Sequence, residues 1–116
     1  MSPQARALAQ ALLDHHKRLR AALGENPAVD SCVLAYGDLC ERAGVPQIKH
    51  RVGKFLREIA DWCDENGWPP LNSLAVNHNT RKPGHGYDTA PGCNLEHWPE
   101  QMVACIYFSD YPDRVN

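Results

Sequence analysis

Apolar residues at helical spacing predict a long first helix over residues 3–23. The apolar positions recur every four or seven residues, at Leu8, Leu12, Leu19 and Leu23. His15 or His16 fills the gap between the second and third of these leucines. Ser2 and Pro3 are a typical helix start, because a serine side chain can cap the first backbone N–H groups and proline fits the first helical position. The apolar stripe is narrow, so we expect this helix to pack against another element.

A short helix, a glycine-containing turn and a longer helix are expected next, and this order is typical of a helix-turn-helix. The short helix begins at Tyr36-Gly37-Asp38, where the Asp38 carboxylate lies near the positive end of the helix dipole. Gly44 and Pro46 together break this helix. The pattern therefore places a turn between residues 43 and 46.

The longer helix is expected over residues 47–65, where apolar side chains fall within one arc of about 120°. These side chains are Ile48, Val52, Phe55, Leu56, Ile59, Trp62 and Cys63. His50, Lys54 and Arg57 lie on the opposite side of the helix. Gly53 is unusual inside a helix, where glycine costs about 1 kcal/mol relative to alanine. We interpret it as a place where another backbone approaches closely.

Strand and turn patterns after the long helix predict a β-hairpin. Residues 71–77 alternate imperfectly between two faces and are expected to form a strand. Residues 78–86 are rich in turn formers, and Tyr87 is expected to begin a return strand. The tip carries Arg81 and Lys82. A hairpin with a basic, glycine-rich tip after a helix-turn-helix is typical of a wing.

A last helix is expected over residues 98–109, because Pro99 and Glu100 suit a first helical turn. The apolar run 102–108 would also fit a buried strand, and the helix is favoured over it. The predicted fold is α+β and mainly helical. It has a winged helix-turn-helix-like core, an added N-terminal helix and a C-terminal helical segment.

Length and composition indicate one soluble domain of 116 residues, with 43% hydrophobic residues. No apolar run approaches the roughly 20 residues that cross a bilayer, and the basic, interrupted N-terminal stretch does not fit a secretory signal. The five cysteines are odd in number and none forms a Cys-x-x-Cys pair. Reduced, mostly buried thiols in a cytoplasmic protein are therefore expected, and a disulfide framework or zinc knuckle is disfavoured.

Charge is divided unevenly along the chain, although the net charge is only −2. Residues 42–57 hold five Lys or Arg and no Asp or Glu, whereas residues 88–116 hold five Asp or Glu and a single arginine. A local basic stripe can bind phosphates even on an acidic protein. The same stripe would also fit a solvated helix face.

Four features in the middle of the chain resemble the DNA-binding domain of the alkylguanine-DNA alkyltransferases and their alkyltransferase-like relatives. The resemblance covers residues 33–87, about half of the chain. In chain order they are Tyr36-Gly37-Asp38-Leu39, Arg51-Val52-Gly53, a proline-led strand, and Gly84-His85-Gly86-Tyr87. In those families the first, second and fourth correspond to a helix start, a recognition helix and a glycine-rich wing. The resemblance implies that Tyr36 lies by a DNA phosphate, that Arg51 fills the gap left by a flipped nucleotide, and that Gly53 permits close packing.

The segment after the long helix departs from that family. Alkyltransferases have Pro-Cys-His-Arg on this strand, whereas residues 70–76 read Pro-Leu-Asn-Ser-Leu-Ala-Val and Ser73 falls near the place of the cysteine. An alkyl-accepting cysteine is therefore excluded at that position. Residues 60–68 also lengthen the recognition helix beyond the family pattern.

The predicted loop around residues 77–88 allows three interpretations. Arg81 and Lys82 would contact phosphates, helped by backbone N–H groups near the glycines. His78 or His85 would act as a general base in an enzyme, with Arg81 stabilising an anion and Tyr87 in the same loop. The third interpretation is an exposed polar turn without a function. A metal site from His78 and His85 is a weaker alternative, and neither a metal nor a cofactor is expected.

Three functions compete on these patterns. The first is a non-catalytic module that binds nucleic acid, DNA above all. Its expected contact residues are Tyr36, Lys49, Arg51, Lys54, Arg57, Arg81 and Lys82. The second is a small regulator or inhibitor, such as one of mobile-element origin, that binds a protein partner through the same fold; its acidic C-terminal segment would suit a basic partner. The third is an enzyme that uses the loop from His78 to Tyr87.

Overall fold

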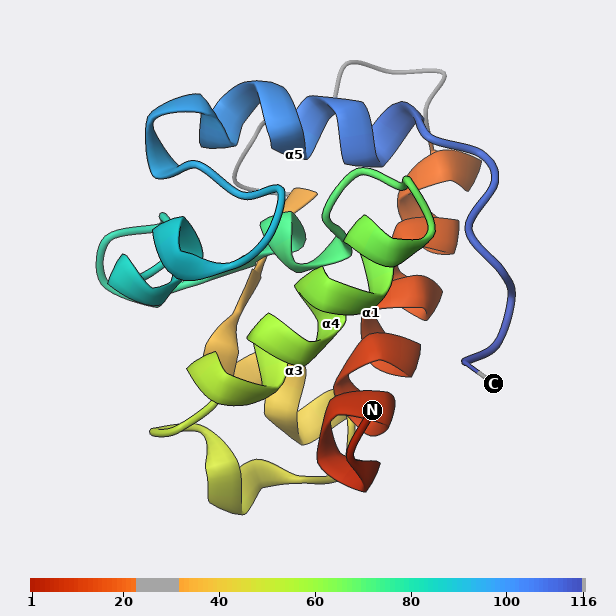
Figure 1. The fold of residues 1–116 in the computed structure, drawn as a ribbon. Helices are drawn as coiled ribbons and strands as arrows, with labels where there is room; N and C mark the ends of the chain where they lie inside the picture. Colours follow the sequence, from red (N-terminus) through yellow and green to blue (C-terminus); the bar gives the residue numbers. More distant parts are fainter. Residues whose placement is uncertain (23–31, 116) are drawn as a thin grey trace.

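The computed structural model describes residues 1–22 and 32–115, and most of them are helical (Figure 1). The α-helices are α1 (Pro3–Ala21), α3 (Tyr36–Arg42), α4 (Gly53–Glu65) and α5 (Trp98–Tyr107). Short 3-10 turns are η1 (Pro46–Ile48), η2 (Leu71–Leu74), η3 (His85–Thr89) and η4 (Leu95–His97). Two short strands, β1 (Leu34–Ala35) and β2 (Ala75–Val76), pair in parallel. The predicted class, α+β and mainly helical, is confirmed.

Helix α1 packs against α3, α4 and α5. It ends at Ala21, two residues before the predicted end, which lies outside the described residues. Ser2 caps it as expected, accepting a hydrogen bond from the Ala5 N–H at 3.2 Å. Both histidines of the predicted stripe are buried, with ring Nε2 atoms 2.8 Å from the Cys32 carbonyl for His15 and 2.9 Å from the Cys105 carbonyl for His16. These bonds explain how two polar rings replace leucines on a packed face.

The predicted helix over 47–65 is wrong in its first part. Residues 46–48 form η1, and α4 begins only at Gly53. Ile48 and Val52 are nevertheless buried, at 1% and 4% exposure, because the irregular segment turns the same side chains inward as a helix would. Gly53 is therefore the first residue of α4 and not an interior glycine. A Cβ there would meet no heavy atom within 4 Å, so the expected close backbone approach is also wrong.

The predicted hairpin is wrong as well. Residues 71–74 form η2, β2 pairs in parallel with β1, and the expected return strand at Tyr87 is the 3-10 turn η3. All six residues from 71 to 76 are buried, so their side chains do not alternate between the core and the solvent. The loop 77–82 closes on itself, with the Asn77 N–H donating to the Lys82 carbonyl at 2.8 Å. The segment expected as a two-stranded wing is thus a closed loop followed by a 3-10 turn.

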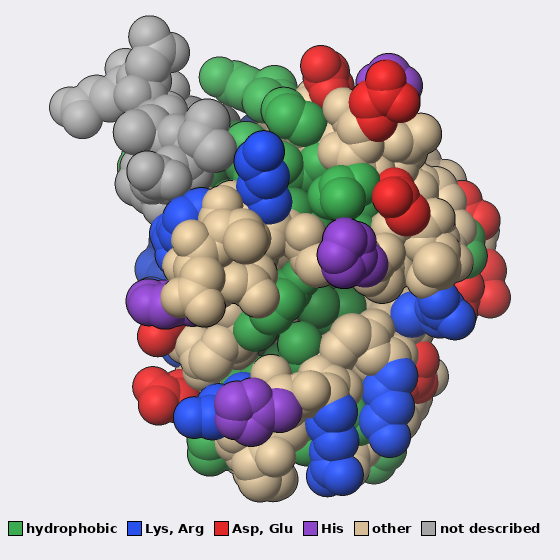
Figure 2. All heavy atoms as spheres, turned by 90° about the vertical axis from the view of Figure 1, so that its left-hand side faces the viewer, with side chains coloured by type: hydrophobic (Ala, Val, Ile, Leu, Met, Phe, Trp, Pro, Cys, Tyr) green, Lys and Arg blue, Asp and Glu red, His purple; other side chains and the backbone are tan. Residues whose placement is uncertain are grey.

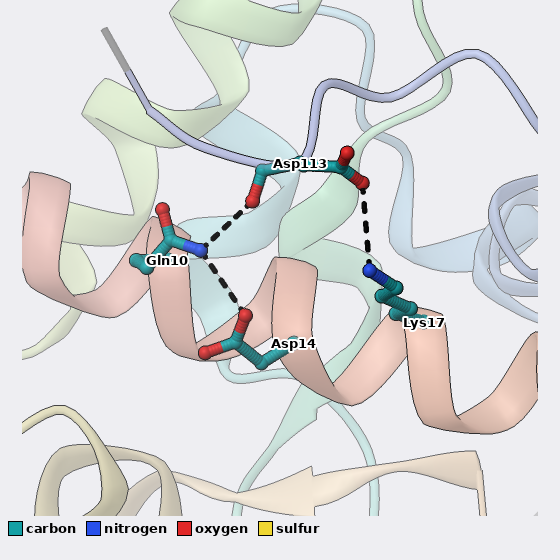
Figure 3. A network of polar contacts seen from close by, with 4 residues as sticks. All are labelled: Gln10, Asp14, Lys17 and Asp113. Carbon is teal, nitrogen blue, oxygen red and sulfur yellow. Dashed lines mark hydrogen bonds and ion pairs between the residues drawn. The ribbon is translucent and has the colours of Figure 1, made fainter.

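The C-terminal segment forms α5 and then runs back along α1 (Figure 1). The helix prediction for the apolar run was correct, although α5 ends at Tyr107 and not at residue 109. Gln10 of α1 holds the returning tail: its Nε2 donates to the Asp113 carbonyl at 3.0 Å, and its Oε1 accepts the Val115 N–H at 3.0 Å. Lys17 adds an exposed ion pair to the Asp113 carboxylate, 3.8 Å away (Figure 3). Within the described ranges, no helix has the length and apolar character that crossing a membrane requires.

Candidate nucleic-acid interface

Four separate segments enclose a cavity of ≈ 120 Å³. The first is Tyr36 at the start of α3, and the second is the start of α4 with the residue before it, from Val52 to Arg57. The third is η2 and β2, through Asn72 and Ala75. The fourth is the segment 83–90, which includes η3. Most of the lining is apolar, so the cavity suits a largely apolar group better than an ion.

An apolar patch with basic side chains on some of its sides lies on the face that carries η3 and the start of α4. This face lies on the left in Figure 1 and is turned toward the viewer in Figure 2, where hydrophobic side chains occupy its middle. Lys and Arg side chains gather mainly in the lower half of that view, and Asp and Glu lie mainly along the upper edge and the sides (Figure 2).

Two hydrogen bonds tie the helices to the loop that closes the cavity. The Tyr36 hydroxyl accepts the Gly84 N–H at 2.7 Å, and an Arg57 guanidinium N–H donates to the Thr89 hydroxyl. Thr89 in turn donates to the Gly86 carbonyl at 2.8 Å. Burial raises the pKa of Tyr36, and the hydrogen bond from Gly84 partly offsets this. The hydroxyl therefore stays protonated at neutral pH and can still donate its own hydrogen.

The predicted phosphate contacts divide into those that border the cavity and those that do not. Arg57 lines it directly. Arg51 and Lys54 are exposed and flank the lining residues 52–53, and exposed Lys82 precedes the lining residue Pro83. The Lys54 ammonium lies 4.9 Å from the centre of the Phe55 ring. The cavity thus brings together basic positions of the helix start and of the loop.

Three other predicted contacts have different positions. Lys49 is exposed at the end of η1 and does not line the cavity. Arg81 is half-buried in the loop with a φ of 57°, in the left-handed region. Tyr36 directs its hydroxyl to Gly84 within the cavity wall, so it is a lining residue as well as a residue at the start of α3.

The residues of the predicted loop site differ in their exposure. His78 and His85 are exposed, whereas Tyr87 is buried and donates its hydroxyl to Gln101 Oε1 of α5 at 2.6 Å. Burial raises the pKa of Tyr87 strongly, so this hydroxyl is not a base near neutral pH. In the part of the chain that the structure describes, no three His, Cys, Asp or Glu side chains are placed to hold a metal ion.

The cysteines are free, and four of the five are buried, as expected for structural thiols. Burial raises the pKa of Cys63 to about 12 and that of Cys105 to about 11. Burial also raises the pKa of half-buried Cys93. A thiol must be deprotonated to act as a nucleophile, so these three are unsuited to accepting an alkyl group near neutral pH.

The sequence patterns did not identify two residues of the site. Asn72 lines the cavity from the buried turn η2, and Thr89 receives the Arg57 hydrogen bond. The pair Asn72-Ser73 does interrupt an otherwise apolar run, and a polar pair in a buried segment is a signal for a site. Thr89 gives no such signal in the sequence.

No known protein-family model matches the chain, and neither a curated protein nor a solved structure matches it. The resemblance to alkyltransferase DNA-binding domains therefore depends on the short motifs around Tyr36, Arg51 and Gly84.

Proposed function

We propose that this chain is a non-catalytic module that binds nucleic acid, with duplex DNA as the main ligand. The observation that carries the proposal is that one cavity is bordered both by the start of α4 and by the loop before η3. Basic side chains accompany both borders, from Arg51 to Arg57 on one side and at Arg81 and Lys82 on the other. Phosphate contacts from such residues supply most of the affinity of a DNA-binding protein and fix its register.

The residues proposed to contact nucleic acid are those predicted from the sequence. Lys49 is the member of this set that lies away from the cavity. In this proposal α3 and α4 serve as the helix pair, and the loop 77–90 takes the place of a wing. Its closed turn presents Lys82 to solvent, next to the cavity lining. Arg51, just before α4, is exposed and adjoins the cavity residue Val52.

The cavity would accept one nucleobase extruded from the duplex. Its lining is mostly apolar and includes the rings of Tyr36 and Tyr87, which suit the faces of a base. Extrusion costs a few kcal/mol of lost stacking, and a side chain such as Arg51 entering the stack offsets part of this cost. This arrangement agrees with the role that the resemblance implies for Arg51.

A chemical step on the bound base is not part of the proposal. Residue 73, near the expected place of an alkyl-accepting cysteine, is a buried serine. The nearby half-buried thiol of Cys93 has a pKa raised by burial, so it is mostly protonated at neutral pH. The module would therefore recognise nucleic acid and leave it unchanged.

Fluorescence anisotropy of a labelled duplex at low salt tests the proposal. The full chain should bind in the micromolar range or tighter, and Lys54→Ala and Lys82→Ala should each weaken binding. Lys17→Ala is the matched control, because Lys17 is an exposed lysine that pairs with the C-terminal tail along α1 (Figure 3). Absence of binding at tens of micromolar protein would contradict the proposal.

A protein partner is the second candidate, and α5 is the observation that favours it. Val103 and Tyr107, spaced by four residues, are 46% and 61% exposed, and Glu100 lies on the same helical face. An exposed apolar pair with an acidic neighbour would suit a basic, partly apolar partner. A pull-down from a native extract with the Tyr107→Ser variant as control distinguishes the two functions. Recovery of nucleic acid without a stoichiometric protein would argue against this candidate.

A further inference from the structure

The cavity at the start of α4 has a buried floor and an open mouth. The floor is made of buried apolar side chains, among them Leu56 and Ala75. Gly53 and Gly86 line the same cavity but are exposed, and a Cβ on either would meet no heavy atom within 4 Å. A small molecule can therefore enter from the solvent and reach an apolar interior.

The volume of this cavity limits its occupant to one compact apolar group. The cavity measures ≈ 120 Å³. An apolar cavity of roughly 150 Å³ in a protein interior can hold a benzene molecule. An unfilled apolar cavity lacks the dispersion contacts that its lining would make with an occupant. The space therefore favours an apolar body of about six carbon atoms.

Arg57 brings a positive charge to the mouth of the cavity. It lines the cavity and is exposed. One guanidinium N–H donates to the Thr89 hydroxyl, which leaves further N–H donors for a ligand. Among the described residues, no acidic side chain forms an ion pair with Arg57. A guanidinium in this state is suited to a carboxylate from a ligand, whose oxygens accept hydrogen bonds from its planar N–H groups.

The acidic residues that adjoin this wall in the sequence are engaged with other groups. Glu58, next to Arg57 in α4, accepts hydrogen bonds from the Ser2 backbone N–H at 2.8 Å and from the Ser2 hydroxyl at 2.7 Å. Asp88 of η3 accepts the Leu95 N–H. Neither carboxylate therefore takes the place at Arg57 that a ligand carboxylate would fill.

The Tyr36 hydroxyl adds a second donor to the cavity wall. It accepts the Gly84 N–H at 2.7 Å, and its own hydrogen bonds to none of the described residues. An ionised carboxylate only accepts hydrogen bonds, whereas an alcohol or an amine brings donors of its own. The donors at Tyr36 and Arg57 therefore suit a carboxylate better than a neutral group of the same size.

We propose that this cavity binds a small monocarboxylate whose apolar body fills the floor and whose carboxylate pairs with Arg57 at the mouth. Benzoate represents this class, since its ring is of the size that the cavity holds and its carboxylate carries one negative charge. The inference goes beyond the proposed function and does not depend on it, because it concerns the chain without nucleic acid.

An NMR titration of the full, isotopically labelled chain tests the inference with three probes. Benzoate has both the ring and the charge, benzyl alcohol has the ring alone, and acetate has the charge alone. Benzoate should bind with a Kd of about 1 mM or lower, and the other two should each bind about tenfold more weakly. The backbone amide signals of Gly53, Gly84 and Gly86 should shift, since these residues line the cavity.

Two arginine variants separate a specific contact from a general effect of charge. Arg57→Gln removes the charge from the mouth, and it should reduce the preference for benzoate over benzyl alcohol to within about twofold. Arg51→Gln is the matched control, because Arg51 is exposed and precedes the lining residue Val52 without lining the cavity itself. It should keep the wild-type preference. Circular dichroism shows whether each variant folds, and the comparison of probes on the wild type stands even where a variant does not.

Three results with the wild type would overturn the inference. They are absence of saturable benzoate binding at about 10 mM, amide shifts confined to residues outside the cavity, and equal affinity for benzoate and either other probe. An unchanged preference in folded Arg57→Gln would overturn the pairing with Arg57. The titration contains no nucleic acid, so its failure leaves the proposed function standing, and failure of duplex binding leaves this inference standing.

Discussion

The hydroxyl of Tyr36 accepts a hydrogen bond from the backbone N–H of Gly84 at 2.7 Å, joining residues 48 positions apart. Tyr36 is the first residue of α3, and Gly84 precedes η3. The bond therefore fixes the loop against the start of a helix and holds one wall of the cavity in place. Two of the motifs that carry the alkyltransferase resemblance meet at this contact.

Tyr36→Phe should loosen this wall without unfolding the protein. The Gly84 N–H loses its acceptor, and the free energy of unfolding should fall by about 1 kcal/mol. Urea denaturation measures that change, and faster hydrogen exchange at the Gly84 amide would locate it. Tyr107→Phe is the control, since the Tyr107 side chain is 61% exposed, and it should change stability little. Equal effects of the two variants would show that the Tyr36–Gly84 bond is not a tether.

Two glycines should respond oppositely to alanine. A Cβ at Gly53 would meet no heavy atom within 4 Å, and the residue begins α4 with no left-handed φ. Gly53→Ala should leave stability unchanged or raise it by about 0.5 kcal/mol, since alanine restricts the unfolded chain. Gly92 has a φ of 71°, and a Cβ there would lie 3.2 Å from an Asp64 carboxylate oxygen.

Gly92→Ala should therefore lower the free energy of unfolding by about 1 kcal/mol or more. Thermal unfolding of both variants under one buffer condition gives the comparison. A marked loss at Gly53 would restore the idea that another backbone approaches it closely.

Stability should decrease as the pH falls below neutrality, because of the two buried histidines of α1. Burial lowers the pKa of His15 below its ordinary value of 6.5, and Arg42 and Arg18 lower it further, although the hydrogen bond to Cys32 opposes them. Burial also lowers the pKa of His16, with Arg20 acting in the same direction and the Cys105 carbonyl opposing. The unfolded chain therefore binds protons at a higher pH than the folded one.

The contribution of these neutral rings to the free energy of unfolding is fully present above pH 6.5 and is lost as the pH falls through and below that value. Denaturant unfolding at several pH values between 7.5 and 5.5 measures it. In His15→Gln the amide can still donate to the Cys32 carbonyl but cannot titrate, so this variant should show a flatter profile. His50→Gln, at an exposed position, should keep the wild-type slope. A wild-type profile as flat as that of His15→Gln would contradict the explanation.

Helices with one repeated buried stripe could be predicted from the sequence, and the irregular segments could not. The patterns of α1 and of the part of α4 after Gly53 repeat over several turns and match their observed buried faces, whereas α5 was predicted from Pro99 and Glu100 at its start. Residues 46–52 form a 3-10 turn and a bend, yet they bury Ile48 and Val52 as a helix would. The spacing of apolar residues therefore did not reveal that this segment is not part of the helix. In residues 71–76 both faces are buried, and no alternation distinguishes a strand from a turn.

Only part of the candidate site could be predicted from the sequence. Its basic residues stand out because no acid interrupts residues 42–57. The cavity did not stand out, because its wall combines four segments that meet only in the folded chain. Asn72 could have been singled out by its polarity within a buried run, but its unpaired oxygen is a property of the three-dimensional packing.

The salt dependence of duplex binding tests the central claim most directly. The logarithm of the association constant is measured against the logarithm of the salt concentration for the wild type, Lys54→Ala, Lys82→Ala and Lys17→Ala. Each phosphate contact contributes about 0.9 to the slope on duplex DNA, so the Lys54 and Lys82 variants should each have a slope shallower by about that amount. Lys17→Ala should keep the wild-type slope. Identical slopes for all four proteins, or no measurable binding at low salt, would contradict the claim that the rim of this cavity binds nucleic acid.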